Sequence, residues 1–227
     1  MQDLLFKVGP LAVYQWGLYL AISYLIGIFY FWRLGRKEGF ASDSLLDLIF
    51  QSSLVGLLGG RLAFLLTFSI GWEIADLLRV SSGILWGGVF LGGASAAGVF
   101  IYLNRWSLGR IADGAFTALA LGQAVGYLGA EVTNNITFGF YPAAGFFLGW
   151  LILRFLLNRG ISSGYPTAFY LAFSGGLLYL TEWLRPAKAL LTNGLNVNYI
   201  FSGVLAGLGV ILFLILVARR ASFKVKR

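Results

Sequence analysis

Seven long apolar segments divide the chain, and each can cross the hydrocarbon core of a bilayer as a helix. They lie near residues 11–32, 45–72, 84–103, 111–131, 140–157, 166–184 and 199–218. Backbone groups find no water in lipid, so an apolar segment of about 20 residues crosses it as an α-helix. The sequence therefore predicts an all-α polytopic membrane protein with seven transmembrane helices. Residues 1–227 are expected to form a single transmembrane domain with no large soluble part.

Composition narrows the chemistry that such a protein can perform. Charged residues make up 11% of the chain, against about 25% in soluble domains. Neither cysteine nor histidine is present, which removes disulfides, thiolate metal sites and the commonest general base. We therefore expect no metal and no cofactor. Any catalysis must rely on carboxylate, Tyr, Lys, Arg or amide side chains.

The distribution of cations predicts an orientation. The loops on one side carry Arg33, Arg36, Lys37, Arg105, Arg110, Arg154, Arg159, Arg219, Arg220, Lys224, Lys226 and Arg227, and the loops on the other carry Lys7, Arg79, Arg185 and Lys188. Cytoplasmic loops are enriched in Lys and Arg. The N-terminus is therefore expected outside and the C-terminus in the cytoplasm. The net charge of +8 lies in short loops beside apolar segments, which indicates membrane topology and not a nucleic-acid partner.

Arg61 departs from this pattern because it lies inside the apolar stretch from Leu45 to Trp72. A cation at that depth costs between about 2.5 and more than 10 kcal/mol. Three kinds of partner offset such a cost: a buried carboxylate such as Glu131 or Glu182, a water-filled cavity, or an anionic ligand.

A lipid phosphate is the ligand that suits this side chain. The guanidinium offers two parallel donors that match phosphate oxygens. Gly59 and Gly60 come immediately before Arg61, and we expect them to let a headgroup approach the backbone.

Glycines recur at a spacing of four residues, which lets helix backbones approach closely in membranes. The pairs are Gly83/Gly87, Gly88/Gly92, Gly122/Gly126, Gly145/Gly149 and Gly203/Gly207.

Two acidic residues stand at the outer ends of predicted spans. Glu182 and Arg185 are three residues apart and can pair along one helical face. Glu131 has no cation near it in the sequence. An ion pair near the headgroups or a carboxylate in water explains both, so a ligand role and a purely structural role stay open.

Several segments resemble prolipoprotein diacylglyceryl transferase, a seven-helix bacterial inner-membrane enzyme, in the right order over almost the whole chain. They are VGPLAVYQWGLYLAISY (8–24), GGRLAFLL (59–66), the glycine turn at 83–88, LGQAVGYLGAEVTNN (121–135), YPAAGFFLGW (141–150), LYLTEWLRP (178–186) and YIFSGVLAGL (199–208). The resemblance implies transfer of the diacylglyceryl group of phosphatidylglycerol to the cysteine thiol of a lipoprotein signal peptide, without a metal. It also implies location in the bacterial cytoplasmic membrane. The implied lipid-binding residues are Arg61, Gly59, Gly60, Gly87, Gly88 and Arg185.

The chain departs from the family pattern at most of its polar positions. Trp16 replaces a functional Tyr, while Tyr14 and Trp86 replace histidines and Leu178 replaces an arginine. The family signature Gly-Arg-x-Gly-Asn-x-x-Asn-x-Glu corresponds to residues 126–135. The Arg, both Asn and the Glu of the signature are replaced by other residues at the corresponding positions. The His-Pro-Ser-Gln-x-Tyr-Glu segment has become residues 141–147.

These replacements predict a catalytically degenerate relative that still binds phospholipid with an anionic headgroup. Transfer to a thiol needs a group that helps to form the thiolate, and no obvious one remains. An active, divergent transferase is the first alternative, with Glu131, Tyr127, Tyr141 or Glu182 as replacement acid–base groups and a lipoprotein signal peptide as partner. An accessory subunit of a larger membrane complex is the second.

Overall fold

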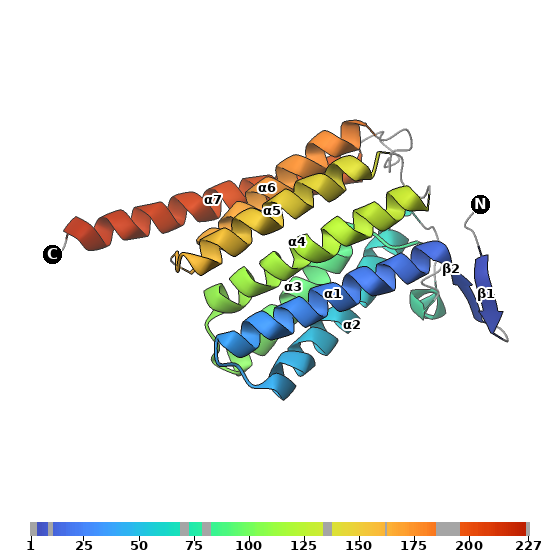
Figure 1. Ribbon diagram of the computed structural model, residues 1–227, viewed down its shortest axis with the longest axis horizontal. Coiled ribbons are helices and arrows are strands. Elements are labelled where there is room, and N and C mark those ends of the chain that lie inside the picture. The colour runs from blue at the N-terminus through green and yellow to red at the C-terminus, as the bar shows by residue number, and fades with distance from the viewer. Residues whose placement is uncertain are drawn as a thin grey trace. The chain divides into compact units, whose positions relative to one another are not determined.

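The computed structural model describes residues 4–8, 11–68, 73–78, 83–133, 138–161, 163–184 and 196–225. This part of the chain is α-helical apart from an N-terminal antiparallel hairpin and one short 3-10 helix (Figure 1). The elements in order are β1 (Leu4–Val8), β2 (Leu11–Tyr14), α1 (Gln15–Lys37), α2 (Ser42–Phe68), η1 (Ile74–Leu78), α3 (Trp86–Leu103), α4 (Leu108–Val132), α5 (Phe140–Asn158), α6 (Tyr165–Trp183) and α7 (Val197–Val225).

The helices confirm a polytopic membrane protein. Within the described residues, six helices have the length and hydropathy to cross a bilayer, namely α1 to α5 and α7. The seventh, α6, contains Tyr, Pro, Thr, Ser and Glu, and nine of its residues are buried. A helix that neighbouring helices cover can carry polar side chains that lipid would not tolerate.

The first span begins later than the sequence predicted. Leu11–Tyr14 forms the second strand of the hairpin and α1 starts at Gln15. Pairing with Leu4–Val8 satisfies backbone groups of these apolar residues before the helix begins.

Contacts divide the chain into two compact units, which we describe separately. The first unit comprises Met1–Leu34, Ala112–Lys188 and Asn198–Arg227, and the second comprises Gly35–Ile111 and Ala189–Val197. The hairpin, most of α1 and α4, and helices α5 to α7 therefore belong to the first unit, whereas α2, η1 and α3 belong to the second. The expected single transmembrane domain stays a prediction.

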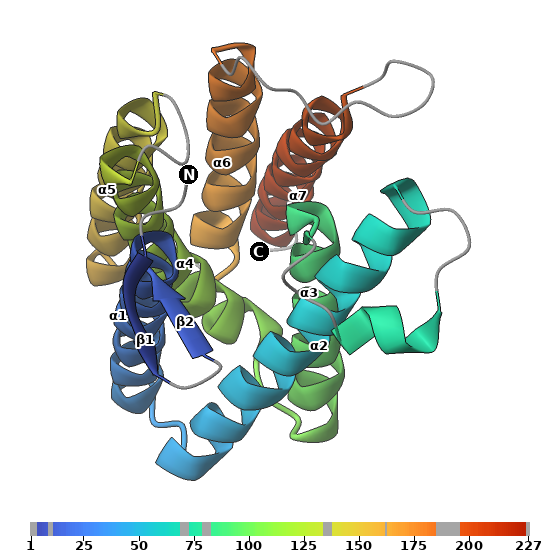
Figure 2. The ribbon, with the colours of Figure 1, turned by 90° about the vertical axis from the view of Figure 1, so that its right-hand side faces the viewer.

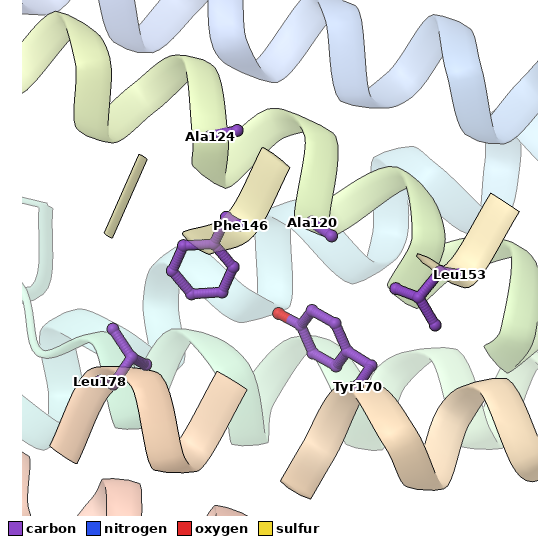
Figure 3. Close-up of a cluster of buried hydrophobic side chains, with 6 residues drawn as sticks. All are labelled: Ala120, Ala124, Phe146, Leu153, Tyr170 and Leu178. Atoms are coloured by element: carbon purple, nitrogen blue, oxygen red, sulfur yellow. The ribbon is translucent and has the colours of Figure 1, made fainter. Parts of the chain in front are cut away.

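The core of the first unit lies where α4, α5 and α6 meet. Phe146 of α5 and Tyr170 of α6 are 0% and 2% exposed and project toward Ala120 and Ala124 of α4 (Figure 3). The two alanines leave room for the rings. The Tyr170 hydroxyl donates a hydrogen bond of 2.7 Å to Gln123 Oε1, which satisfies a polar group that burial would otherwise penalise.

Glycines bring α6 and α7 close together in the same unit. A methyl group added at Gly175 would lie 2.6 Å from the Ser202 carbonyl oxygen, and one at Gly209 would lie 2.7 Å from the Ala172 Cα. The Gly203/Gly207 pair, by contrast, has no atom of the described chain within 4 Å of an added methyl group. The prediction that this pair brings helices together is therefore wrong for the described chain.

Candidate functional site

Arg61 lies on α2, seven residues before the helix ends at Phe68, and its side chain is 2% exposed. Its guanidinium reaches the segment that links α2 to α3. Nε donates to the Asp76 carbonyl oxygen and Nη1 to the Gly83 carbonyl oxygen, each at 2.9 Å. The Phe64 ring centre lies 5.4 Å from the guanidinium carbon, within cation–π range. Arg61 is therefore nearer the end of its helix than the sequence predicted.

These partners satisfy donors of the guanidinium without cancelling its charge. Asp76 contributes its main-chain carbonyl here, and its carboxylate accepts a hydrogen bond of 3.0 Å from the Glu73 N–H. Among the described residues of the second unit, no carboxylate forms an ion pair with Arg61, and the ion pair recorded there joins exposed Arg110 and Glu38. A buried charge without an opposite charge is costly, so the site suits an anion.

The glycines beside Arg61 lie against α3. A methyl group at Gly59 would lie 2.8 Å from the Gly88 carbonyl oxygen, and one at Gly60 would lie 3.1 Å from the Leu85 carbonyl oxygen. One at Gly88 would lie 2.5 Å from the Gly59 carbonyl oxygen. Figure 2 shows that α2 and α3 cross each other. The structure thus gives these glycines a packing role, and their contact with a headgroup stays a prediction. Gly87, the fourth predicted glycine, is partly buried on α3.

Glu131 closes the corner between α4 and α5. Its Oε2 accepts a hydrogen bond of 2.6 Å from the main-chain N–H of Gly139, the residue that precedes α5. Phe138, just before it, has a φ of 63°, which a bulky residue rarely adopts. A carboxylate that accepts from the first N–H groups of a helix is favourable, so this geometry explains Glu131 structurally.

The other three candidate acid–base residues of the first unit lie in different surroundings. Tyr127 stacks on Phe146, with ring centres 5.6 Å apart. Tyr141 is 58% exposed. Glu182 is 2% exposed, and its Oε1 accepts a hydrogen bond of 3.0 Å from Asn198 Nδ2.

The predicted partner of Glu182, Arg185, lies outside the described residues, as do Asn134 and Asn135. The expected pair of Glu182 and Arg185 therefore stays a prediction.

Asp113 is a polar centre whose role the sequence did not show. Its side chain is 3% exposed. Oδ2 accepts from the Gly164 N–H at 2.8 Å, and Oδ1 accepts from the N–H and the hydroxyl of Thr167 at 2.9 and 2.5 Å. Gly164 precedes α6 and supplies no side-chain cap. A carboxylate on α4 thus caps α6 from 51 residues away. The sequence signal that could have identified Asp113 is an acidic residue inside a predicted apolar span.

The chain matches known sequences over nearly its whole length. The family model described as prolipoprotein diacylglyceryl transferase matches residues 3–215. The chain belongs to this family. Among relatives named phosphatidylglycerol–prolipoprotein diacylglyceryl transferase, the protein of Caldanaerobacter subterraneus is 32% identical over 165 residues, which are 68% of this chain and 63% of the relative. That of a Thermoanaerobacter species is 29% identical over 76% of this chain and 75% of the relative. That of Brucella ovis is 27% identical over 78% and 65%.

Membership of the prolipoprotein diacylglyceryl transferase family confirms the resemblance. Two positions at which the resemblance implies a different residue can be located in the structure. Leu178, where the resemblance implies an arginine, is 8% exposed and belongs to the apolar core of the first unit. Trp86, where the resemblance implies a histidine, begins α3 and is 37% exposed. Leu178 therefore packs inside the first unit, and Trp86 presents an exposed indole at the start of α3.

Proposed function

We propose that this family member binds an anionic phospholipid, of which phosphatidylglycerol is the leading candidate, and no longer transfers its diacylglyceryl group. The observation that carries the proposal is the buried guanidinium of Arg61, which is held by two neutral carbonyls. A phosphate oxygen would supply the negative charge that its described surroundings lack. The relatives' names supply the identity of the lipid.

The guanidinium has a donor left for such a ligand. Nε and Nη1 each donate to a carbonyl, and the Nη2 amino group donates to no described residue. Paired contacts from an arginine to phosphate are charge-assisted and about twice as strong as neutral hydrogen bonds. Arg61 is only 2% exposed, so a phosphate reaches it only when η1 or Gly83, which hold the guanidinium, shift. This requirement favours slow lipid exchange and retention during purification.

The loss of transfer is supported by the state of the candidate acid–base groups. The whole chain contains no histidine. Glu131 holds the start of α5 through Gly139, and Glu182 accepts from Asn198. A general base must reach the proton it removes, and these carboxylates already act as acceptors for the fold.

The proposal includes a membrane topology. All seven helices α1 to α7 cross the cytoplasmic membrane of a bacterium, with the N-terminus outside and the C-terminus inside. The alternation of cation-rich and cation-poor loops along the sequence supports this orientation. Burial of the polar side chains of α6 supports its inclusion as a span.

We expect no rescue when this chain is expressed in bacteria depleted of their own transferase. Growth and lipid labelling of a reporter lipoprotein measure the transfer directly. The Thermoanaerobacter relative serves as the positive control, and membrane expression of both proteins is verified with a tag. Labelling above background from this chain would establish the divergent active transferase instead. If a larger assembly copurifies without bound anionic lipid, the accessory-subunit alternative replaces the lipid-binding proposal.

Substitution Arg61→Ala should lower the amount of anionic phospholipid that copurifies with the protein in mild detergent by at least fivefold. The removed charge is the one that binds the phosphate. Quantitative lipid mass spectrometry gives the ratio of anionic to zwitterionic lipid, a readout that loss of packing alone does not change selectively.

Arg61→Lys is the matched variant, because it keeps the charge and loses the planar fork. It should retain an intermediate amount of anionic lipid. An unchanged lipid ratio in Arg61→Ala would assign Arg61 to the α2–α3 connection alone and end the lipid proposal.

A further inference from the structure

A second lipid site is indicated on the outside of the first unit, in a groove between α1 and α4. The groove is open, has a volume of about 350 Å³ and is lined by Leu25, Ile26, Phe29, Tyr30 and Leu121. Leu25 and Phe29 are 62% and 60% exposed. In a protein that crosses a bilayer, such a groove faces hydrocarbon and accepts an acyl chain.

Aromatic contacts connect this groove to α5. The Tyr30 ring packs edge-on against the Trp150 ring, with centres 5.9 Å apart. A cation also contacts this cluster, because the Arg154 guanidinium lies 5.5 Å from the Trp150 ring centre. The groove, the indole and a guanidinium are therefore contiguous.

Two arginines stand at the same end of the groove. Figure 1 shows α1 and α5 running in the same direction. Arg33 follows Tyr30 by three residues, and Arg154 follows Trp150 by four, so each lies one turn beyond the ring contact. Both arginines are exposed. Their helix positions place them at a similar height on adjacent helices.

We propose that an anionic phospholipid docks here with one acyl chain in the groove and its phosphate between Arg33 and Arg154. The site is separate from Arg61 and does not depend on the proposed loss of transfer. The lining is apolar and its open end is cationic, which matches the chemistry of such a lipid. Arg and Lys near a membrane surface contribute about 1 kcal/mol each to binding anionic lipid, which corresponds to about fivefold in affinity.

The test places a photoreactive group inside the groove. Phe29→p-benzoylphenylalanine is introduced into the full chain, which is reconstituted in nanodiscs of phosphatidylcholine containing increasing phosphatidylglycerol. After irradiation, intact-mass spectrometry identifies the adduct. We expect a phosphatidylglycerol adduct enriched far above its share of the bilayer. Arg154→Gln should raise the half-saturating phosphatidylglycerol fraction about fivefold, and the double substitution Arg33→Gln/Arg154→Gln about thirtyfold.

Arg159→Gln, at the residue that follows α5, is the matched control. Arg159 stacks on Phe155 at 5.0 Å much as Arg154 stacks on Trp150, and Phe155 does not line the groove. This variant should leave the adduct unchanged. Equal effects of Arg154→Gln and Arg159→Gln would reduce the finding to general surface charge and overturn the site. Adducts in proportion to bilayer composition, or a polypeptide adduct in place of lipid, would also overturn it.

Discussion

Gly88→Ala should destabilise the protein by about 3 kcal/mol, because it forces α2 and α3 apart. An added methyl group at Gly88 would lie 2.5 Å from both the Ala63 Cβ and the Gly59 carbonyl oxygen, and 2.9 Å from the Gly60 Cα. Backbone atoms cannot move aside as a flexible side chain can. Overpacking a tight interface costs typically 1–3 kcal/mol, and here the contact is with the backbone of the facing helix. Thermal unfolding in detergent, followed by circular dichroism, measures the loss.

Gly98→Ala, on the same helix, is the matched control. An added methyl group at Gly98 meets nothing within 4 Å, so the substitution should cause no loss of stability. It brings only the better helix propensity of alanine. Equal behaviour of the two variants would mean that α3 does not pack on α2 through this glycine face. If Gly88→Ala instead kept full stability and lost bound lipid, the glycine would contact the headgroup, as the sequence predicted.

Asp113→Ala should cost about 4 kcal/mol, the other large effect expected in this chain. It removes the acceptor of two main-chain N–H groups and one hydroxyl at the start of α6. Each buried donor left without a partner costs about 1–3 kcal/mol, and the loss of a helix cap costs about 1 kcal/mol. Unfolding in detergent and protease cleavage near residue 164 measure the effect.

Two further variants test whether loss of the α6 cap causes the loss of stability in Asp113→Ala. Asp113→Asn keeps one acceptor oxygen and turns an amide toward a donor, so it should lose about half as much stability. Asp43→Ala removes an exposed acid from the first turn of α2 and should lose only about 0.5 kcal/mol from the helix dipole. Similar losses in Asp43→Ala and Asp113→Ala would point to net charge and exclude the cap.

The spans were predictable because each depends on local chemistry. A run of apolar residues must form a helix in lipid whatever its neighbours are, and α2 to α5 and α7 lie close to the ranges predicted for them. The hairpin was missed because Leu11–Tyr14 is as apolar as the start of a helix and becomes a strand only by pairing with Leu4–Val8. The hydropathy of α6 is lowered by residues such as Thr167 and Glu182, whose polar groups are satisfied by partners from other helices.

The candidate site was likewise predictable only in part from the sequence. The identity of Arg61 as the unusual residue followed from its charge and its apolar surroundings. The hydrogen-bond acceptors of Arg61 could not be predicted from the sequence. The carbonyls of Asp76 and Gly83 are 15 and 22 residues away along the chain, and every residue has a carbonyl. The paired glycines next to Arg61 signalled close approach, but only the packed helices showed that α3 is what approaches.

The sequence by itself determined the membrane class, the family and the places of most helices. These follow from residue type and from spacing along one chain. Only the tertiary structure decided that Asp113 caps α6, that Glu131 closes the α4–α5 corner and that Gly88 meets the backbone of α2. A hydrogen bond or a steric contact joins atoms brought together by folding, and a side chain's chemistry does not name the distant partner that will satisfy it.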